Sequence, residues 1–380
     1  MDEWAQAPLA DLVDCLDHRR KPIRSQDRNR GPFPYYGASG VIDHVAGFIF
    51  EGLHLLIAED GENLRTRKTP VAFLADGRFW VNNHAHVVKG NHRADTQYLS
   101  YAVQAADISG FLTGSTQPKL TKDSMLHIRV PAPPVVEQQA IAGVLGALDD
   151  KIESNRRIGT QLDHLFMLEC EALVEGAPLA AIKRMADVAE ISLGGTPSRA
   201  MPEFWDGGEI AWINSGSLHE RPVLTPADFI TEDGLARSAT KVIPAGATVV
   251  AITGATLGVV SRLGRPMAIN QSVVAVASTD DAFNCYLYYW MRSNIGSLVS
   301  SATGAAQQHV NKGNFEGLQV EIPEHHTLAE VGKRSSLLAQ QVALARESLT
   351  LASLRDALLP ELLSGRLRVG AAEEFVEAAV

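Results

Sequence analysis

Two long stretches of the chain repeat apolar residues at three- and four-residue steps, the spacing of one helix face. The first stretch, residues 134–176, shows this spacing at Ile141, Leu145, Leu148 and Ile152 and again at Leu162, Phe166 and Leu173. The second, residues 324–367, shows it at Leu338, Val342, Ala345 and Leu349 and again at Leu351, Leu354, Leu358 and Leu362. A helix of about 35–40 residues is about 55 Å long. The pattern therefore predicts two struts, each too long for an ordinary globular domain.

A strand-like segment that ends at proline precedes each long helix, and the first such segment recurs before the second helix. The matching residues lie 190 positions apart and include Gly114/Gly304, Gln117/Gln307, Leu120/Val310, Lys122/Lys312, Met125/Phe315 and Pro133/Pro323. Further upstream, residues 98–101 correspond to residues 286–289. The sequence therefore predicts a tandem duplication with pseudo-twofold symmetry, in which each half is a mixed α/β module followed by a long helix.

Alternating apolar residues and turn residues outline the elements of both modules. In the first module, residues 1–133, we expect a short helix over 9–16, strands over 48–50, 55–57, 79–81 and 86–88, and a helix over 95–106. In the second module, residues 177–323, we expect strands over 210–213 and 248–252 and a helix over 283–293. Pro360 should kink or end the second long helix shortly before Gly365. The acidic, alanine-rich residues 368–380 are expected to be disordered. The predicted fold class is α+β.

The composition suits a soluble protein with two cores. Of its 380 residues, 46% are apolar, which is enough to fill two domains. No run of 18 uncharged apolar residues occurs, and residues 1–14 are acidic where a signal peptide would be basic. We therefore expect a cytoplasmic protein with no membrane contact. Cys15, Cys170 and Cys285 are too scattered to indicate a disulfide framework or a metal cluster.

The net charge of −10 argues against strong non-specific binding to nucleic acid, which needs clustered basic residues. Two local clusters weaken that objection. Residues 18–30 hold six of the 34 basic residues, and residues 65–68 form a second cluster. Such runs indicate a solvated loop as readily as a binding surface.

Searches for catalytic motifs fail along the whole sequence. The segment from Gly254 to Gly258 lacks the lysine and the spacing of a phosphate-binding loop. His84 and His86 would point to the same side of a strand, but no third metal ligand lies near them. No combination of a nucleophile with a base can be argued either. We therefore expect no active site, no metal and no cofactor in this chain.

Several segments resemble the specificity subunits of type I restriction-modification systems. The run from Gly114 to Arg157, with Gln-x-x-Leu-x-Lys before Pro-Pro-x-x-Glu-Gln and a long helix, is similar to that family, and so is the run from Leu354 to Leu367. The segments at 34–40 (PYYGASG) and 193–199 (LGGTPSR) resemble two openings of its target recognition domains. The resemblance spans essentially the whole chain.

The resemblance implies a protein that reads DNA and performs no chemistry. Residues 1–133 and 177–323 would be two target recognition domains, each reading one half of a split site in double-stranded DNA. Residues 134–176 and 324–367 would pack antiparallel as a spacer. Methyltransferase subunits would dock on the helices and use S-adenosylmethionine, while restriction and translocase subunits would use ATP and Mg. Two modules on such a spacer could contact sites about one DNA turn apart, near 34 Å.

The candidate DNA-binding residues are loop residues of the types that read base edges or contact phosphates. In the first module they are Arg19, Arg20, Lys21, Arg24, Arg65, Arg67, Lys68, Gln117, Lys119 and Lys122. In the second module they are Thr196, Ser198, Arg199, Asn214, Ser215, Ser217, Gln307, Gln308, His309, Asn311 and Lys312. For each, ordinary surface polarity is the alternative, and the paired Gln117/Gln307 and Lys122/Lys312 could equally cap the strand before the long helix.

Two other functions remain open at this point. The chain could be the specificity subunit of a different DNA-modifying assembly, or a coiled-coil scaffold that binds only proteins. The duplicated Gln/Lys segments and the basic loops argue against the scaffold.

Overall fold

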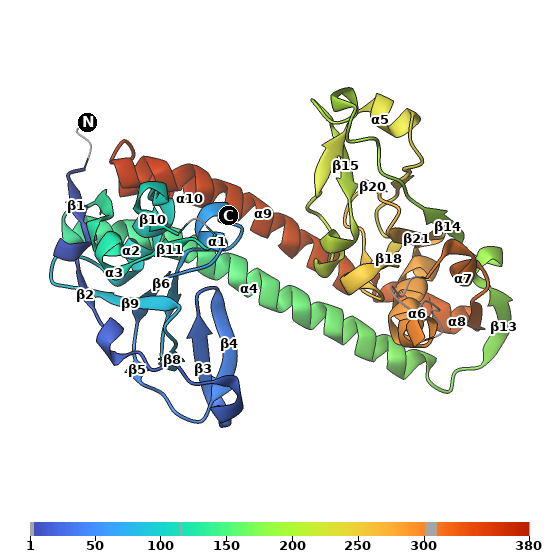
Figure 1. Cartoon of the computed structure of the whole chain (residues 1–380). Coiled ribbons are helices and arrows are strands. Elements are labelled where there is room, and N and C mark those ends of the chain that lie inside the picture. The colour runs from blue at the N-terminus through green and yellow to red at the C-terminus, as the bar shows by residue number, and fades with distance from the viewer. Residues whose placement is uncertain (1–3, 115, 301–309, 380) are drawn as a thin grey trace. The chain divides into compact units, whose positions relative to one another are not determined.

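The structure, a computed structural model, describes residues 4–114, 116–300 and 310–379 (Figure 1). The chain forms two compact units. Unit 1 comprises residues 1–152 and 350–380, and unit 2 comprises residues 153–349. The long helices α4 (Val135–Val174) and α9 (Ser335–Ser364) each contribute one part to each unit.

Unit 1 contains two four-stranded sheets. One has the order β2-β9-β6-β7, formed by Val13–Cys15, Ala85–Gly90, His54–Ala58 and Ala72–Ala75. The other has the order β4-β3-β8-β5, formed by Gly40–Val45, Arg30–Gly37, Arg78–Val81 and Phe50–Glu51. Two further antiparallel pairs are β1 (Gln6–Pro8) with β12 (Arg129–Pro131) and β10 (Leu112–Thr113) with β11 (Lys119–Leu120).

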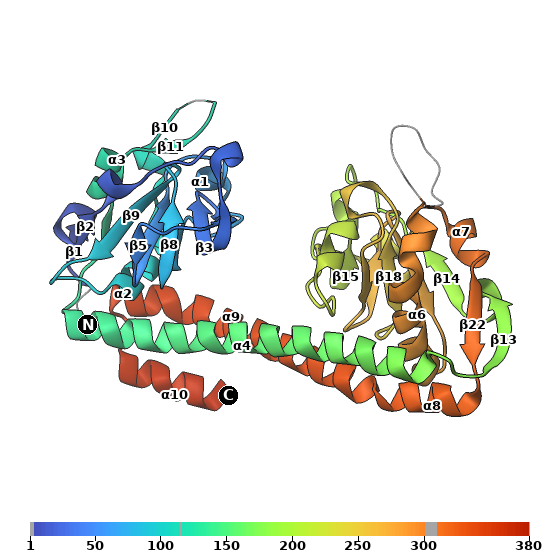
Figure 2. The same cartoon turned by 90° about the horizontal axis from the view of Figure 1, so that it is seen from below.

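The helices of unit 1 join its strands to α4 and α9. They are α1 (Asn63–Thr66), α2 (Thr96–Ala105), α3 (Lys122–His127) and α10 (Val369–Ala379). Figure 2 shows α2 between the strands and α4. One core therefore contains Leu99 of α2, Leu145 of α4 and Leu362 of α9, all fully buried. The apolar face that predicted the struts is the face that closes this core.

Unit 2 is built in the same way. Its sheets have the orders β14-β21-β18-β19 (Glu190–Leu193, Val273–Ala277, Thr248–Ala251, Val260–Arg262) and β16-β15-β20-β17 (Asp228–Ile230, Ile210–Ile213, Met267–Ile269, Val242–Ile243). β13 (Leu179–Arg184) pairs with β22 (Gln319–Pro323). The helices are α5 (Glu232–Ala236), α6 (Asp281–Ser300), α7 (Lys312–Glu316) and α8 (His325–Lys333), and α6 lies between β18 and α8 (Figure 2).

The strand pairing confirms the predicted duplication. In each unit the second sheet has one parallel pair at its centre, β3 with β8 in unit 1 and β15 with β20 in unit 2. The Tyr98 hydroxyl donates to the Pro131 carbonyl at 3.0 Å, and the equivalent Tyr286 hydroxyl donates to the Glu321 carbonyl. The two tyrosines therefore tie the second helix of each module to the strand that precedes its strut.

Within each unit α4 and α9 lie side by side. In unit 1, Arg355 of α9 binds Asp149 of α4 at 2.6 Å. In unit 2, Asn155 bonds to Glu347 at 3.0 Å, and Gln341 donates to the Gly159 carbonyl at 3.2 Å. Higher residue numbers on α4 thus pair with lower residue numbers on α9. The two helices are therefore antiparallel, as the resemblance implied.

The helix that the sequence predicted near the N-terminus is wrong. The predicted helix over residues 9–16 is a single 3₁₀ turn, Leu9–Asp11, followed by strand β2. β2 pairs with β9 through Val13↔Gly90 and Cys15↔Val88, so long-range pairing overrides the helical pattern. The helix expected over 95–106 is confirmed as α2. Its start is fixed by Asp95, whose side chain accepts the Tyr98 N–H at 2.8 Å.

The second strut is divided where no break was predicted. α8 ends at Lys333 and α9 begins at Ser335. The expected end at Pro360 does not occur, because α9 continues to Ser364. A proline inside a helix removes one backbone hydrogen bond, and its ring crowds the carbonyl of the preceding turn. The buried Leu358 and Leu362 nevertheless hold the final turns against the core of unit 1.

The C-terminal segment also differs from the prediction of disorder. Residues 369–379 form α10, whose Ala372 is buried in the core of unit 1. The Arg368 guanidinium lies over the Trp4 ring at 3.9 Å. Among the described helices, none is both long and apolar enough to span a membrane.

Candidate nucleic-acid interface

The hairpin β10–β11 carries the repeated Gln/Lys segment of unit 1. Gln117 and Lys119 are exposed on it, and Gly114 takes the positive φ of 84° that its turn requires. The Pro118 carbonyl accepts the Gly61 N–H at 3.1 Å, which ties the hairpin to the end of β6. Gln117 is therefore presented to solvent from a fixed base.

The two repeated lysines open short helices that are capped alike. Lys122 is the first residue of α3, which the Thr121 hydroxyl caps by accepting the Ser124 N–H at 3.1 Å. Lys312 is the first residue of α7, which the Asn311 side chain caps. The repeat thus includes a helix start at which Thr121 and Asn311, and not the lysines, are the caps. Gln307, Gln308 and His309 lie outside the described residues.

The basic segment at residues 18–30 divides into exposed and buried members. Lys21 and Arg24 are exposed. Arg19 is exposed as well, although its guanidinium donates to the Ile49 carbonyl at 2.6 Å. Arg20 is 14% exposed and lies between Asp17 at 3.2 Å and Glu59 at 2.7 Å. Arg20 therefore has its charge neutralised inside unit 1.

Arg67 in the second cluster also bonds inward, whereas Arg65 and Lys68 are exposed. Its guanidinium donates to the carbonyls of Gln104 at 2.8 Å and Ala106 at 2.6 Å, at the C-terminal end of α2. A cation there satisfies carbonyls that the helix leaves unpaired and suits the negative end of the helix dipole.

Replacing Arg67 with alanine is expected to lower the free energy of unfolding by about 1.5–3 kcal/mol, because two charge-assisted bonds are lost. Recognition of DNA by the folded protein should not change. Chemical denaturation and a gel shift of the assembled complex would measure the two effects. The exposed neighbour variant Lys68→Ala is the control and should alter stability by less than about 0.5 kcal/mol. A weaker preference for one base pair in Arg67→Ala would show that Arg67 reads DNA.

In unit 2 the candidates lie on two loops. Thr196, Ser198 and Arg199 are exposed after β14, and the Arg199 guanidinium stacks on Trp205 at 3.3 Å and binds Asp228 at 2.6 Å. Asn214, Ser215 and Ser217 follow β15 and are half-buried. The Asn214 side chain accepts the Gly216 N–H at 2.8 Å and starts a 3₁₀ turn.

The sequence missed an arrangement that is shared by the two units. In unit 2, Arg199 is near Trp212 of β15 and binds Asp228, the strand partner of Trp212. In unit 1, Arg28 lies 4.6 Å from the Tyr35 ring of β3 and 3.1 Å from Asp43, the strand partner of Tyr35. Neither Arg28 nor Asp43 is among the candidate residues predicted from the sequence. The spacing between these residues differs between the halves, so no constant sequence offset could have revealed the match.

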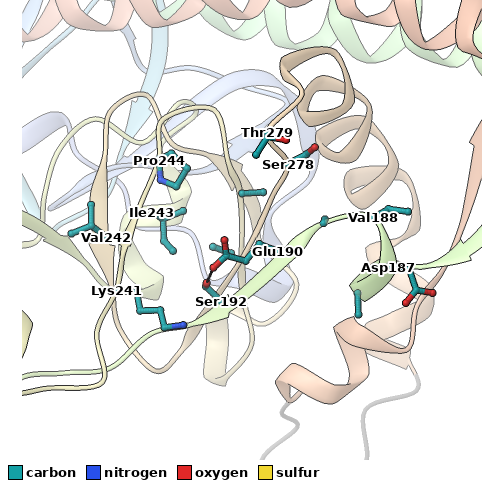
Figure 3. Close-up of a pocket in the computed structure, with 14 residues that line it drawn as sticks. Asp187, Val188, Glu190, Ser192, Lys241, Val242, Ile243, Pro244, Ser278 and Thr279 are labelled. Atoms are coloured by element: carbon teal, nitrogen blue, oxygen red, sulfur yellow. Dashed lines mark hydrogen bonds between the residues drawn. The ribbon is translucent and has the colours of Figure 1, made fainter.

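Unit 2 also contains an open pocket of about 450 Å³ beside β14 and β17 (Figure 3). Its charged lining residues are of both signs, Lys241 against Asp187 and Glu190, and Glu190 accepts the Ser192 hydroxyl at 3.2 Å. In the described parts of the chain no group of three metal-ligating side chains occurs. The pocket offers no recognisable catalytic combination.

Comparison with protein families decides the assignment. The model of the family described as "Type I restriction modification DNA specificity domain" matches residues 1–164 and again residues 180–333. The chain belongs to this family. The two matches correspond to the two modules, so the type I specificity domain is present twice, as the resemblance had indicated.

Individual relatives agree with the family assignment. The chain is 37% identical over 150 residues to a putative type I restriction enzyme specificity subunit of Haemophilus influenzae, covering 38% of this chain and 37% of that protein. It is 23% identical over 345 residues to the MjaIX specificity subunit of Methanocaldococcus jannaschii, covering 83% and 79%. The fold is similar to the crystal structure of a type I S subunit from M. genitalium, with a TM-score of 0.62, 14% identity, and 95% and 96% of the two chains covered.

Proposed function

We propose that the chain is the DNA sequence-specificity subunit of a type I restriction-modification complex. Each unit reads one half of a bipartite site in double-stranded DNA. The observation that carries the proposal is the duplicated module: two type I specificity domains with the same strand order, each joined to the same pair of antiparallel helices. A protein with two similar reading modules suits a target that has two halves.

The exposed members of the candidate set are proposed as the DNA contacts. In unit 1 they are Arg19, Lys21, Arg24, Arg65, Lys68, Gln117, Lys119 and Lys122. In unit 2 they include Thr196, Ser198, Arg199 and Asn311. Glutamine suits adenine, arginine suits guanine, and lysine suits phosphate. Arg20 and Arg67 are proposed instead to stabilise unit 1, because their guanidinium groups bond within it.

The helices are proposed to dock methyltransferase subunits. On the part of α4 in unit 2, Ile158, Leu165 and Leu168 are 40%, 41% and 48% exposed. Apolar side chains repeated along one exposed helix favour a protein interface. Catalysis then belongs to the partners, with S-adenosylmethionine in the methyltransferase and with ATP and Mg in restriction and translocase subunits. Such a complex would act on DNA in the cytoplasm.

Adenine methylation mapped across the host genome, with and without this gene, tests the proposal. We expect one split motif to lose its methylation when the gene is deleted and to regain it when the gene is restored. If no split motif depends on the gene, the type I assignment of function fails. Genes for methyltransferase and translocase subunits beside this one would distinguish the type I complex from another DNA-modifying assembly.

A further inference from the structure

Five ionisable side chains from four segments of unit 1 meet at the base of the β10–β11 hairpin: Asp17, Arg20, Glu59, His86 and Lys119. The side chains of His86, Asp17 and Glu59 are only 1%, 7% and 13% exposed. Charges so far from water are costly unless they are paired and hydrogen-bonded. The cluster therefore needs a reason beyond ordinary surface polarity.

Both ring nitrogens of His86 face hydrogen-bond acceptors. Nδ1 lies 2.6 Å from Oδ2 of Asp17, and Nε2 lies 2.9 Å from the carbonyl oxygen of Leu120. Burial alone would raise the pKa of Asp17, but the hydrogen bond and charge of His86, together with the Val87 N–H and Arg20, bring it below its usual value. Asp17 is therefore an ionised acceptor. The His86 ring therefore bridges the Asp17 carboxylate and the backbone of β11.

The bond from His86 to Leu120 joins the hairpin to the sheet. Leu120 belongs to β11, and its N–H donates to the Glu59 carbonyl at 2.8 Å. The neighbouring Lys119 ammonium lies 3.2 Å from the Glu59 carboxylate. His86 and Glu59 thus hold both sides of the strand that leads from Gln117, so the position of the tip depends on the charged cluster.

Unit 2 makes the equivalent backbone bond without charges. The Val310 N–H donates to the Ile252 carbonyl at 3.0 Å, as the Leu120 N–H does to Glu59. The strand registers Ala58↔Ala85 and Ala251↔Val273 place Ile252 where unit 1 has Glu59, and Val274 where it has His86. Ile252 and Val274 are buried in an apolar core. The fold therefore does not require charges at these positions.

We propose that His86 is a positioning residue whose imidazole ring, held by Asp17, fixes the β10–β11 hairpin so that unit 1 can discriminate the bases of its half-site. The inference rests on the proposed function and assigns a positioning residue to one of its two halves. The groups that face His86 from the surrounding elements are Asp17 and Arg20 from the turn after β2, Glu59 from the end of β6 and Lys119 from β11, with Cys15 beside Asp17.

The test uses the full chain assembled with its methyltransferase subunits and duplexes that carry the mapped split motif. Changing one base pair commonly weakens specific binding about 5- to 150-fold. The His86→Val variant has the residue type that unit 2 carries at this position. In it, the loss of affinity caused by changing one base pair should fall toward one-fold for the first half-site and stay unchanged for the second. His86→Gln keeps one amide donor and should give an intermediate value.

The control is His127→Asn on α3, whose imidazole is 69% exposed beside Asp123, and it should leave both half-sites unchanged. Full discrimination of the first half-site by a folded His86→Val complex overturns the proposal. If the proposed function itself were wrong, a changed base pair in either half-site would leave the affinity of the wild type unaltered.

Discussion

Replacing Asp163 with asparagine is expected to lower the free energy of unfolding by about 3–5 kcal/mol. Asp163 lies on α4, and its carboxylate accepts hydrogen bonds from the Tyr288 hydroxyl at 2.8 Å and from Arg292 at 2.6 Å. The side chains of Asp163 and Arg292 are 9% and 19% exposed. Asparagine keeps the shape of the side chain but removes its charge. The largely buried Arg292 cation would then have no counter-ion, and that loss outweighs the value of the pair itself.

Thermal unfolding measures this effect. For a unit of this size each kcal/mol shifts Tm by about 2–4 °C, so a decrease of about 6–20 °C is expected. The matched control is Glu153→Gln on the same helix. Its partner Arg156 is one helical turn away, and both side chains are more than 60% exposed, so a change of only about 0–1 kcal/mol is expected. Equal losses in the two variants would contradict the account in which Asp163 ties α6 to α4.

The Asp17→Asn variant should show a second loss of about 3–5 kcal/mol, accompanied by a changed response to acid. The substitution leaves the buried Arg20 cation and the His86 ring without the carboxylate that both contact. Burial raises the pKa of Glu59, but Arg20, His86 and Lys119 more than offset it, so the Glu59 pKa is lowered, as is that of Asp17. Both carboxyls therefore bind protons more weakly in the folded chain than in the unfolded chain.

The sign of the pH dependence follows from these two lowered pKa values. Their stabilising contribution is complete above the ordinary values of 3.8 and 4.5 and is lost as the pH falls through the lower values of the folded chain. Urea midpoints between about pH 2 and pH 7 should therefore fall steeply in acid for the wild type and less steeply for Asp17→Asn. Asp14→Asn, at an exposed aspartate on β2, is the control and should follow the wild-type curve. An unaltered acid response in Asp17→Asn would show that the cluster does not carry this stability.

The parts of the fold that the sequence predicted are those with a repeated pattern. The three- and four-residue apolar spacing indicated both struts, and the 190-residue offset indicated the duplication, because each signal accumulates over many positions. Single positions were less informative. Pro360 did not end α9, because Leu358 and Leu362 are held by a core whose other residues come from distant parts of the chain.

The candidate site was predicted by residue type and less well by role. Arg20 and Arg67 have the chemistry of DNA contacts. Apart from Asp17 beside Arg20, however, the partners named for them lie 37 to 65 residues away in sequence and become neighbours only in the fold. From the sequence, His86 could be interpreted only as a metal ligand beside His84 or as an ordinary histidine. Its partners Asp17 and Leu120 lie 69 and 34 residues away in sequence, so no local pattern indicates them. The matching arrangements around Arg28 and Arg199 likewise follow from strand register, which no constant sequence offset reveals.

The most direct test of the central claim, that each half of the chain reads one half of a split DNA site, is an exchange of one module. Residues 1–133 would be replaced by the corresponding module of another type I specificity subunit, and the methylated motif would be mapped in cells that express the hybrid. The account predicts that one half of the motif changes while the other half and the spacing stay as in the wild type. A hybrid that assembles and methylates with both halves changed, or with neither changed, would contradict it.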